Sequence, residues 1–248
     1  MGAENMIFWV TDNKLSKIIA SSFPQGDVEI KHISKFDDTP ADRGIFYGLL
    51  RGCTRAMHIL KHRGIEFFYV DNGYFDAEYV DKNMMKRMDG TYRFCKSGIL
   101  GEFKGKYISG ALSSGRDALL LKPSPWAANY FDTTPEDWVA EWAGVLTNRG
   151  YSVRVRDKNS SIDIDQDIKS SGLVLSFNSI AVLKGIEFGI PSYDSNGMFK
   201  NARLLKDPNH IPRVLYDYED IKDFFSKRQF KLEQFKNGDH RWIIREYL

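Results

Sequence analysis

The sequence predicts an α/β protein made of two Rossmann-like βα halves that face a cleft. Short apolar runs alternate along the chain with stretches of helical period, and glycines stand where several of these helices would end. Such alternation is typical of parallel sheets with helices packed on them. The chain has 248 residues, 42% of them hydrophobic, which suffices for one large core or two small ones.

In the first half, the apolar run MIFWV predicts a buried strand, Asp12-Asn13 predicts a helix start, and Gly64 predicts a helix end. The following stretch, 90–107, is rich in glycine, aromatic and basic residues and predicts a loop or hairpin, and 113–115 predicts a hinge. The expected elements are strand 6–10, helix 14–21, strand 28–33, apolar run 44–50, helix 54–63 and strand 66–70.

The second half repeats the alternation more clearly. Thr133-Thr134-Pro135, followed by two acids, is typical of a helix N-terminus. The expected elements are strand 118–122, helix 138–148, strand 152–156, helix 164–170, strand 172–176, helix 179–188, strand 190–193 and an amphipathic helical tail from 217. We therefore divide the chain into two halves, 1–115 and 116–215, and a helical tail, 216–248.

Asn178 and Ser179 stand where the buried strand LVLS meets the next helix. Backbone N–H groups at such a junction favour an anionic ligand, and open α/β sheets bind ligands at the carboxyl ends of their strands. The equally weighted alternative is that one of the two side chains merely caps the helix.

Arg154 and Arg156 alternate onto one face of the strand SVRVR. Two guanidinium groups on one face suit bidentate contacts to phosphate. The alternative, which is somewhat favoured by the strand alone, is an edge strand with solvated arginines.

Three segments within 118–195 resemble the donor-binding half of GT-B type glycosyltransferases. They are LLLKPSPW, VRVRDK and SGLVLSFNSIAVLKGIEFGIP. The resemblance implies that 116–215 binds the diphosphate of a nucleotide-sugar, with a UDP-sugar as co-substrate and no other cofactor. It carries over to Asn178, Ser179, Arg154 and Lys184, and Arg156 joins the expected donor-binding residues through its place on the same strand face as Arg154. Lys184 stands where many retaining members have a glutamate that holds the donor ribose, so ribose recognition departs from the family pattern.

The first half of the chain resembles phage-encoded DNA-modifying glycosyltransferases. The segments that carry the resemblance are YGLLRGCTRAMHILKHRGIEFFYVDNGYF and, after it, GTYRF. This implies that 1–115 binds the acceptor. Asp71 follows an apolar strand, and a carboxylate there is a candidate general base for the acceptor hydroxyl. The alternative for Asp71 is a structural turn over Asn72-Gly73.

The charge map locates the expected DNA contacts. The net charge is only +2, but 43–63 has five basic residues and no acid, and 82–106 has seven basic residues against two acids. Cations for phosphates interleaved with aromatic rings for stacking are expected of a DNA-facing loop. The expected contacts are Arg51, Arg55, Tyr92, Arg93, Lys96 and Lys104. A solvated basic loop over a small aromatic core is the alternative.

Several classes of protein and site are not expected. Cys53 and Cys95 are lone thiols, typical of a reducing cytoplasm, which would be the host's for a phage protein. His58 and His62 share a helix face, but we interpret them as exposed histidines rather than a metal site, and we expect no metal. The acidic run Asp163-x-Asp165-x-Asp167 is expected to serve a helix start. We expect no association with membranes, and the sequence leaves the oligomeric state open.

Together these patterns predict a glycosyltransferase that moves a sugar from a nucleotide-sugar to a hydroxyl of a hydroxymethylated pyrimidine in phage DNA. One alternative is the same chemistry on a surface glycan. The other is a non-catalytic module that binds nucleotide or DNA on a degenerate transferase fold.

Overall fold

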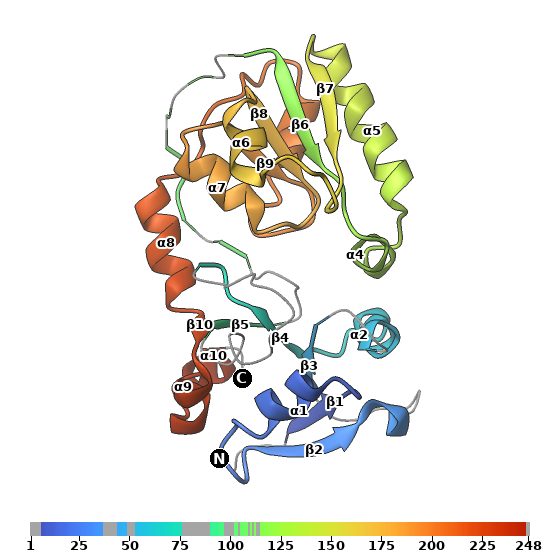
Figure 1. Ribbon diagram of the computed structural model, residues 1–248, viewed down its shortest axis with the longest axis vertical. Coiled ribbons are helices and arrows are strands. Elements are labelled where there is room, and N and C mark those ends of the chain that lie inside the picture. Colours follow the sequence, from blue (N-terminus) through green and yellow to red (C-terminus); the bar gives the residue numbers. More distant parts are fainter. Residues whose placement is uncertain are drawn as a thin grey trace. The chain divides into compact units, whose positions relative to one another are not determined.

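The computed structural model describes residues 6–36, 44–48, 53–75, 90–96, 102–103, 105–108, 110, 112 and 115–246 (Figure 1). The chain forms two compact units. The first unit is Met1–Gly101 with Phe225–Leu248, and the second is Glu102–Phe224. The predicted tail, 216–248, is therefore not separate, because most of it belongs to the first unit.

The first unit is built on a six-stranded sheet in the order β10-β5-β4-β3-β1-β2. Four strands are parallel, and β5 and β10 add to one edge antiparallel. The strands are β1 (Met6–Val10), β2 (Val28–His32), β3 (Gly44–Tyr47), β4 (Phe68–Asn72), β5 (Tyr92–Lys96) and β10 (Gln229–Phe230).

Helices from both ends of the chain cover one face of this sheet. Phe8 of β1 belongs to the same buried cluster as Ile19, Phe235 and Ile243 of helices α1, α9 and α10. Helix α2 packs against β3 and buries Met57. The helices are α1 (Lys14–Ala20), η1 (Ile33–Lys35), α2 (Cys53–His62), α9 (Leu232–Asn237) and α10 (Arg241–Glu246), while α8 (Tyr218–Ser226) spans the boundary between the units.

The second unit contains a four-stranded parallel sheet in the order β7-β6-β8-β9. Leu119 and Leu121 pack with Ile168 of α6, and alternation along β6 turns its other side chains toward the opposite face, where α5 packs (Figure 1). The strands are β6 (Asp117–Leu121), β7 (Ser152–Arg156), β8 (Leu173–Ser176) and β9 (Ser192–Asp194); the helices are α4 (Pro125–Tyr130), α5 (Pro135–Asn148), α6 (Ile164–Lys169), α7 (Ala181–Glu187) and η2 (Ala202–Lys206).

The parallel strands of the two units have the same order. With the strands of each unit numbered along the chain, both sheets begin 2-1-3-4. This order belongs to doubly wound α/β folds, in which the first and third strands are neighbours and their following loops leave in opposite directions. The predicted α/β class is thus confirmed.

Several predictions differ from the structure. Residues 92–96, expected within a loop or hairpin, form β5, which pairs with both β4 and β10. The two residues of β10 were expected within a helical tail, and α4 was not expected. The expected hinge, 113–115, lies largely outside the described residues. Within the described part of the chain, no helix has the length and apolar character needed to cross a membrane.

Candidate functional site

The carboxyl edge of the second sheet contains the position at which its strand order reverses. At this edge Leu121 of β6 pairs in register with Ser176 of β8, so the loops that follow these two strands begin side by side. One loop passes through Ser124, which caps α4, and the other contains Asn178 and Ser179. This is the position at which open α/β sheets bind their ligands.

The loop after β8 is tied down by short-range hydrogen bonds. The Ser176 hydroxyl accepts the backbone N–H of Ser179 at 3.4 Å, and the Ser179 hydroxyl accepts that of Ala181 at 3.2 Å. Ser179 therefore supports the start of α7, as in the capping alternative. Asn178 is half-buried, and no hydrogen bond ties its side chain to another residue of the described chain. Asn178 thus keeps an amide available to a ligand.

A second loop, after β9, packs closely against Asn178. A Cβ atom on Gly197 would lie 3.1 Å from the Asn178 Cα, so glycine is needed for this approach. The Asp194 carboxylate, fully buried, accepts the backbone N–H groups of Gly197 (2.8 Å), Phe199 (2.9 Å) and Lys200 (3.0 Å). Burial raises the pKa of Asp194 from 3.8 to about 6, against the lowering effect of these donors.

Asp194 was missed by the sequence analysis. Its signal is the run Asp194-Ser-Asn-Gly at the end of a buried strand, which is typical of a side chain that caps a tight turn. The same loop is fixed by Trp138, whose Nε1–H donates to the Ser195 hydroxyl at 2.9 Å. These contacts hold one wall of the candidate site rigid.

Arg154 and Arg156 do share a face of β7, as predicted, but both are occupied by one carboxylate. Asp167 of α6 accepts from Arg154 and, at 2.7 Å, from Arg156. Arg154 also donates to the hydroxyls of Ser170 and Ser171. Burial alone would raise the pKa of Asp167, but the hydrogen bonds from Arg156 and Arg154 outweigh burial and lower the pKa below 3.8. Both arginines therefore bind Asp167 in the structure rather than being held ready for the predicted phosphate contacts.

The remaining acids of the run 163–167 also have structural partners. Asp163 caps α6 by accepting the N–H groups of Asp165 and Gln166, which confirms the predicted helix start. Asp165 forms an ion pair with Lys184 of α7. The Lys184 side chain is 43% exposed, and surface pairs of this kind are weak, so Lys184 keeps access to an anionic ligand.

In the first unit, Asp71 and Arg93 form an ion pair between β4 and β5. The Arg93 guanidinium donates to the Asp71 carboxylate at 2.8 Å and to the Asn72 carbonyl at 2.5 Å. Asp71 also accepts the Tyr69 hydroxyl at 2.8 Å, and its side chain is 26% exposed. Arg93 lies within 6 Å of the Tyr69 and Tyr74 rings, a cation–π arrangement. The main contact of the Asp71 carboxylate in the structure is thus the ion pair with Arg93, close to the end of β4.

Most of the expected DNA contacts that the structure describes are already engaged inside the unit. Arg93 is only 5% exposed and Tyr92 only 1% exposed, because both lie in β5, which has a strand on each side, rather than in a loop, so neither can meet DNA as predicted. Lys96 pairs with Glu66, and Arg55 is exposed on α2. Arg51 and Lys104 lie outside the described residues.

Comparison with known proteins adds no assignment. Neither the protein-family models nor the curated proteins contain a match to this chain. The geometry of the site is therefore the basis of the proposals that follow.

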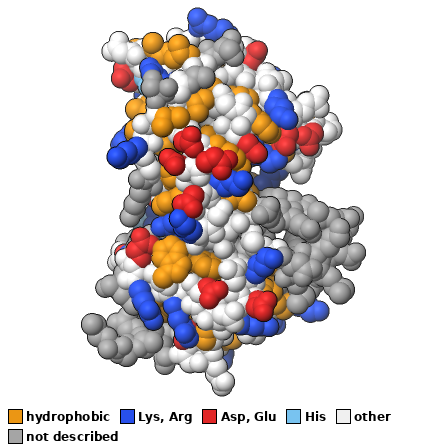
Figure 2. Space-filling view, turned by 90° about the vertical axis from the view of Figure 1, so that its left-hand side faces the viewer, with side chains coloured by type: hydrophobic (Ala, Val, Ile, Leu, Met, Phe, Trp, Pro, Cys, Tyr) orange, Lys and Arg blue, Asp and Glu red, His pale blue; other side chains and the backbone are white. Residues whose placement is uncertain are grey.

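A basic groove in the first unit was also missed. It lies between α1 and α9, has a volume of about 360 Å³, and has Ile18 and Leu232 in its lining. The other lining residues are Lys14, Lys17, Ser21, Ser22 and Lys236, with no acid among them. Its lysines come from segments more than two hundred residues apart, which is why no sequence window revealed it. On the face drawn in Figure 2, basic and acidic side chains are interspersed over the described surface.

Proposed function

We propose that this chain is a GT-B-like glycosyltransferase that takes its sugar from a nucleotide-sugar, with a UDP-sugar as the expected donor. The observation that carries the proposal is the 2-1-3-4 order of parallel strands in both units, since a GT-B enzyme needs two Rossmann-like units. The resemblance of 118–195 to a GT-B donor half supports the same assignment.

The donor diphosphate is proposed to bind at the carboxyl edge of the second sheet. Asn178 would donate its amide N–H groups, and Lys184 would add positive charge. Arg154 and Arg156 take no direct part, because Asp167 occupies both. They stabilise instead the packing of α6 against β7.

The proposed acceptor is a hydroxyl of a hydroxymethylated pyrimidine in DNA, modified in the cytoplasm of a phage host. The lysines of the groove between α1 and α9, Lys14, Lys17 and Lys236, would contact backbone phosphates. Reaction within a duplex would require the target base to be flipped out. Asp71 remains the candidate base, on the strength of its place at the end of β4 and its partly exposed carboxylate.

The pairing of Asp71 with Arg93 favours a second candidate, a non-catalytic module that binds nucleotide and DNA. The Arg93 guanidinium already donates to the Asp71 carboxylate, which leaves that carboxylate less accessible to the proton of an acceptor hydroxyl. A module of this kind would bind the donor and DNA without transfer.

Intact-mass analysis of hydroxymethylated oligonucleotides, incubated with the protein and a panel of nucleotide-sugars, tests the proposal. A mass gain that Asn178→Ala abolishes and Asn159→Ala, an exposed control in the same unit, leaves intact would support a transferase. If the protein binds the donor and DNA but the oligonucleotide gains no mass, the chain is the non-catalytic binding module. Transfer to a glycan acceptor, with no binding to DNA even at low salt, would exclude DNA as the acceptor.

The groove is tested by the salt dependence of DNA binding. Each phosphate contact contributes about 0.9 to the slope of log K against log salt concentration for duplex DNA. We expect Lys14→Gln, Lys17→Gln and Lys236→Gln each to reduce that slope, and Lys206→Gln, on an exposed lysine of the second unit paired with Glu141, to leave it unchanged. Unchanged slopes in all three groove variants would place the DNA elsewhere.

A further inference from the structure

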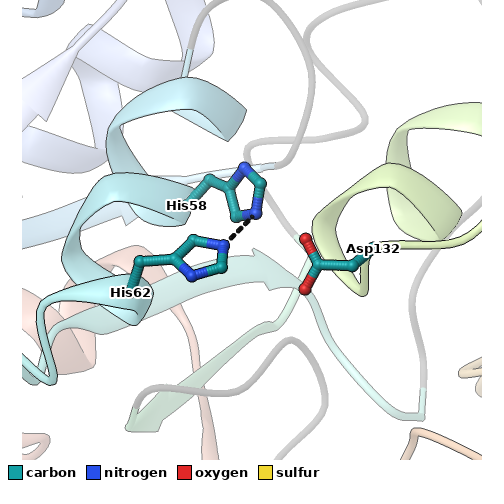
Figure 3. A group of neighbouring side chains, drawn as sticks. All are labelled: His58, His62 and Asp132. Carbon is teal, nitrogen blue, oxygen red and sulfur yellow. Dashed lines mark hydrogen bonds between the residues drawn. The ribbon is translucent and has the colours of Figure 1, made fainter.

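Two histidines on α2 direct the same ring nitrogen toward one another. His58 and His62 are one helical turn apart, and their Nε2 atoms lie 2.6 Å from each other (Figure 3). The ring centroids are 4.3 Å apart and the rings are tilted by 58°. At this separation one Nε2 carries a proton that the other accepts, so the two ring nitrogens already face one another across the space that a single ion could share.

We propose that His58 and His62 together bind a divalent transition-metal ion such as Zn²⁺ through their Nε2 atoms. Zinc–imidazole bonds are about 2.0–2.1 Å long, so two nitrogens on one ion at a tetrahedral or square angle stand roughly 3 Å apart. The observed pair, 2.6 Å apart, needs to open by about 0.3–0.7 Å for a square or a tetrahedral angle, which side-chain rotation permits. The ion would replace the shared proton, and the ring that held this proton on Nε2 would carry it on Nδ1 instead.

The helix fixes the two ligands before the metal arrives. The opposite face of α2 is anchored by buried Ala56, Met57 and Leu60, so its backbone is held in place. His58 is half-buried and His62 exposed, so solvent reaches both rings. Because imidazole suits Zn²⁺, Ni²⁺ and Cu²⁺, whereas Mg²⁺ prefers oxygen ligands, the site should select transition metals. The expectation of two histidines without a metal role is revised accordingly.

Protons should compete with the metal. Imidazole binds metals in its neutral form, so metal affinity should weaken in acid. This inference does not depend on the proposed transferase activity.

The test is calorimetric titration of the metal-free full-length chain with Zn²⁺ at pH 7.5 and 5.5, with Mg²⁺ as the control ion. We expect one Zn²⁺ per chain at pH 7.5 and weaker binding at pH 5.5. His58→Gln and His62→Gln should each lower the affinity about tenfold or more, since even the loss of an outer-shell partner costs about 10–100-fold. His32→Gln, at a histidine of the same unit that ends β2, should leave it unchanged.

A second measurement is independent of the variants. Nitrogen NMR of the histidine side chains should show Zn²⁺ shifting the Nε2 signals of His58 and His62 alone. Zinc binding that survives in the double variant His58→Gln/His62→Gln, zinc shifts at other histidines, or no binding up to millimolar Zn²⁺ would each overturn the proposal.

Discussion

Arg93 on β5 holds Asp71 on β4 across the antiparallel pair, with the guanidinium 2.8 Å from the carboxylate and the arginine side chain only 6% exposed. Burial alone would lower the pKa of Arg93, but Asp71 outweighs burial and raises it. The residue expected to meet DNA and the residue expected to act as base are therefore one internal ion pair.

The first prediction concerns this pair. Arg93→Met should lower the free energy of unfolding by about 3–5 kcal/mol, because Asp71 loses the cation that compensates it. Chemical denaturation measures the change, and Arg63→Met, at an exposed site just after α2, is the control, with a change within about 0.5 kcal/mol. Equal effects at both sites would contradict a special role for the buried pair. Addition of Asp71→Leu to Arg93→Met should recover part of the loss.

The second prediction concerns Asp167, which accepts from two arginines. Asp167→Asn should cost about 1.5–3 kcal/mol at pH 7, the range for hydrogen bonds to charged groups. Because the folded-state pKa lies below the unfolded value of 3.8, this stability is present above pH 3.8 and is lost as the pH falls through the folded-state pKa. The difference between the two proteins should thus vanish in strong acid. Asp165→Asn, on the same helix but in a surface pair, should cost less than about 1 kcal/mol.

The third prediction concerns His240, which is fully buried among Phe23, Phe94 and Phe235 and whose ring nitrogens have no hydrogen-bond partner in the described structure. Burial lowers its pKa from 6.5 to about 4. As the pH falls from 6.5 to 4, His240 therefore binds a proton in the unfolded chain but stays neutral in the folded chain. The free energy of unfolding should therefore fall by up to about 3 kcal/mol as the pH is lowered through this window.

His240→Phe isolates this effect, because phenylalanine fits an aromatic cluster and cannot titrate. The stability difference between the variant and the natural chain should grow in favour of the variant from pH 6.5 to 4. Asp194 acts with the opposite sign, since its raised pKa makes its contribution more favourable as the pH falls from about 6 to 3.8, but it is common to both proteins. A difference that does not change with pH would contradict the prediction.

The fourth prediction concerns Gly197. A Cβ there would meet the Asn178 Cα at 3.1 Å and the Asp194 Cγ at 3.2 Å, so Gly197→Ala should displace the candidate site loop at a cost of about 1–3 kcal/mol. Gly144→Ala is the matched control: it lies within α5, and its Cβ would meet nothing within 4 Å. The control should be neutral or stabilising by up to about 1 kcal/mol. Thermal melting and donor titration of both variants compare stability and site integrity.

Sequence patterns determined the elements whose cause is local. The bounds of β1 and β7 agree with the predicted strands, and Thr134, within the predicted N-terminal signal, caps α5. Apolar period and capping chemistry act within a few residues, so a single window contains the information. The α/β class follows from the repetition of such windows.

Tertiary structure decided which side chains meet. Strand β5 was missed because it depends on β4 and on β10, which lies more than a hundred residues later. The alternation of Arg154 and Arg156 was readable from the sequence, but their partner Asp167 was not, and likewise Arg93 lies 22 positions from Asp71. The repeat of a strand or helix along the sequence fixes the face on which a charged side chain lies. Only the packing of distant segments fixes the partner, and a buried charge requires one because burial without compensation is too costly.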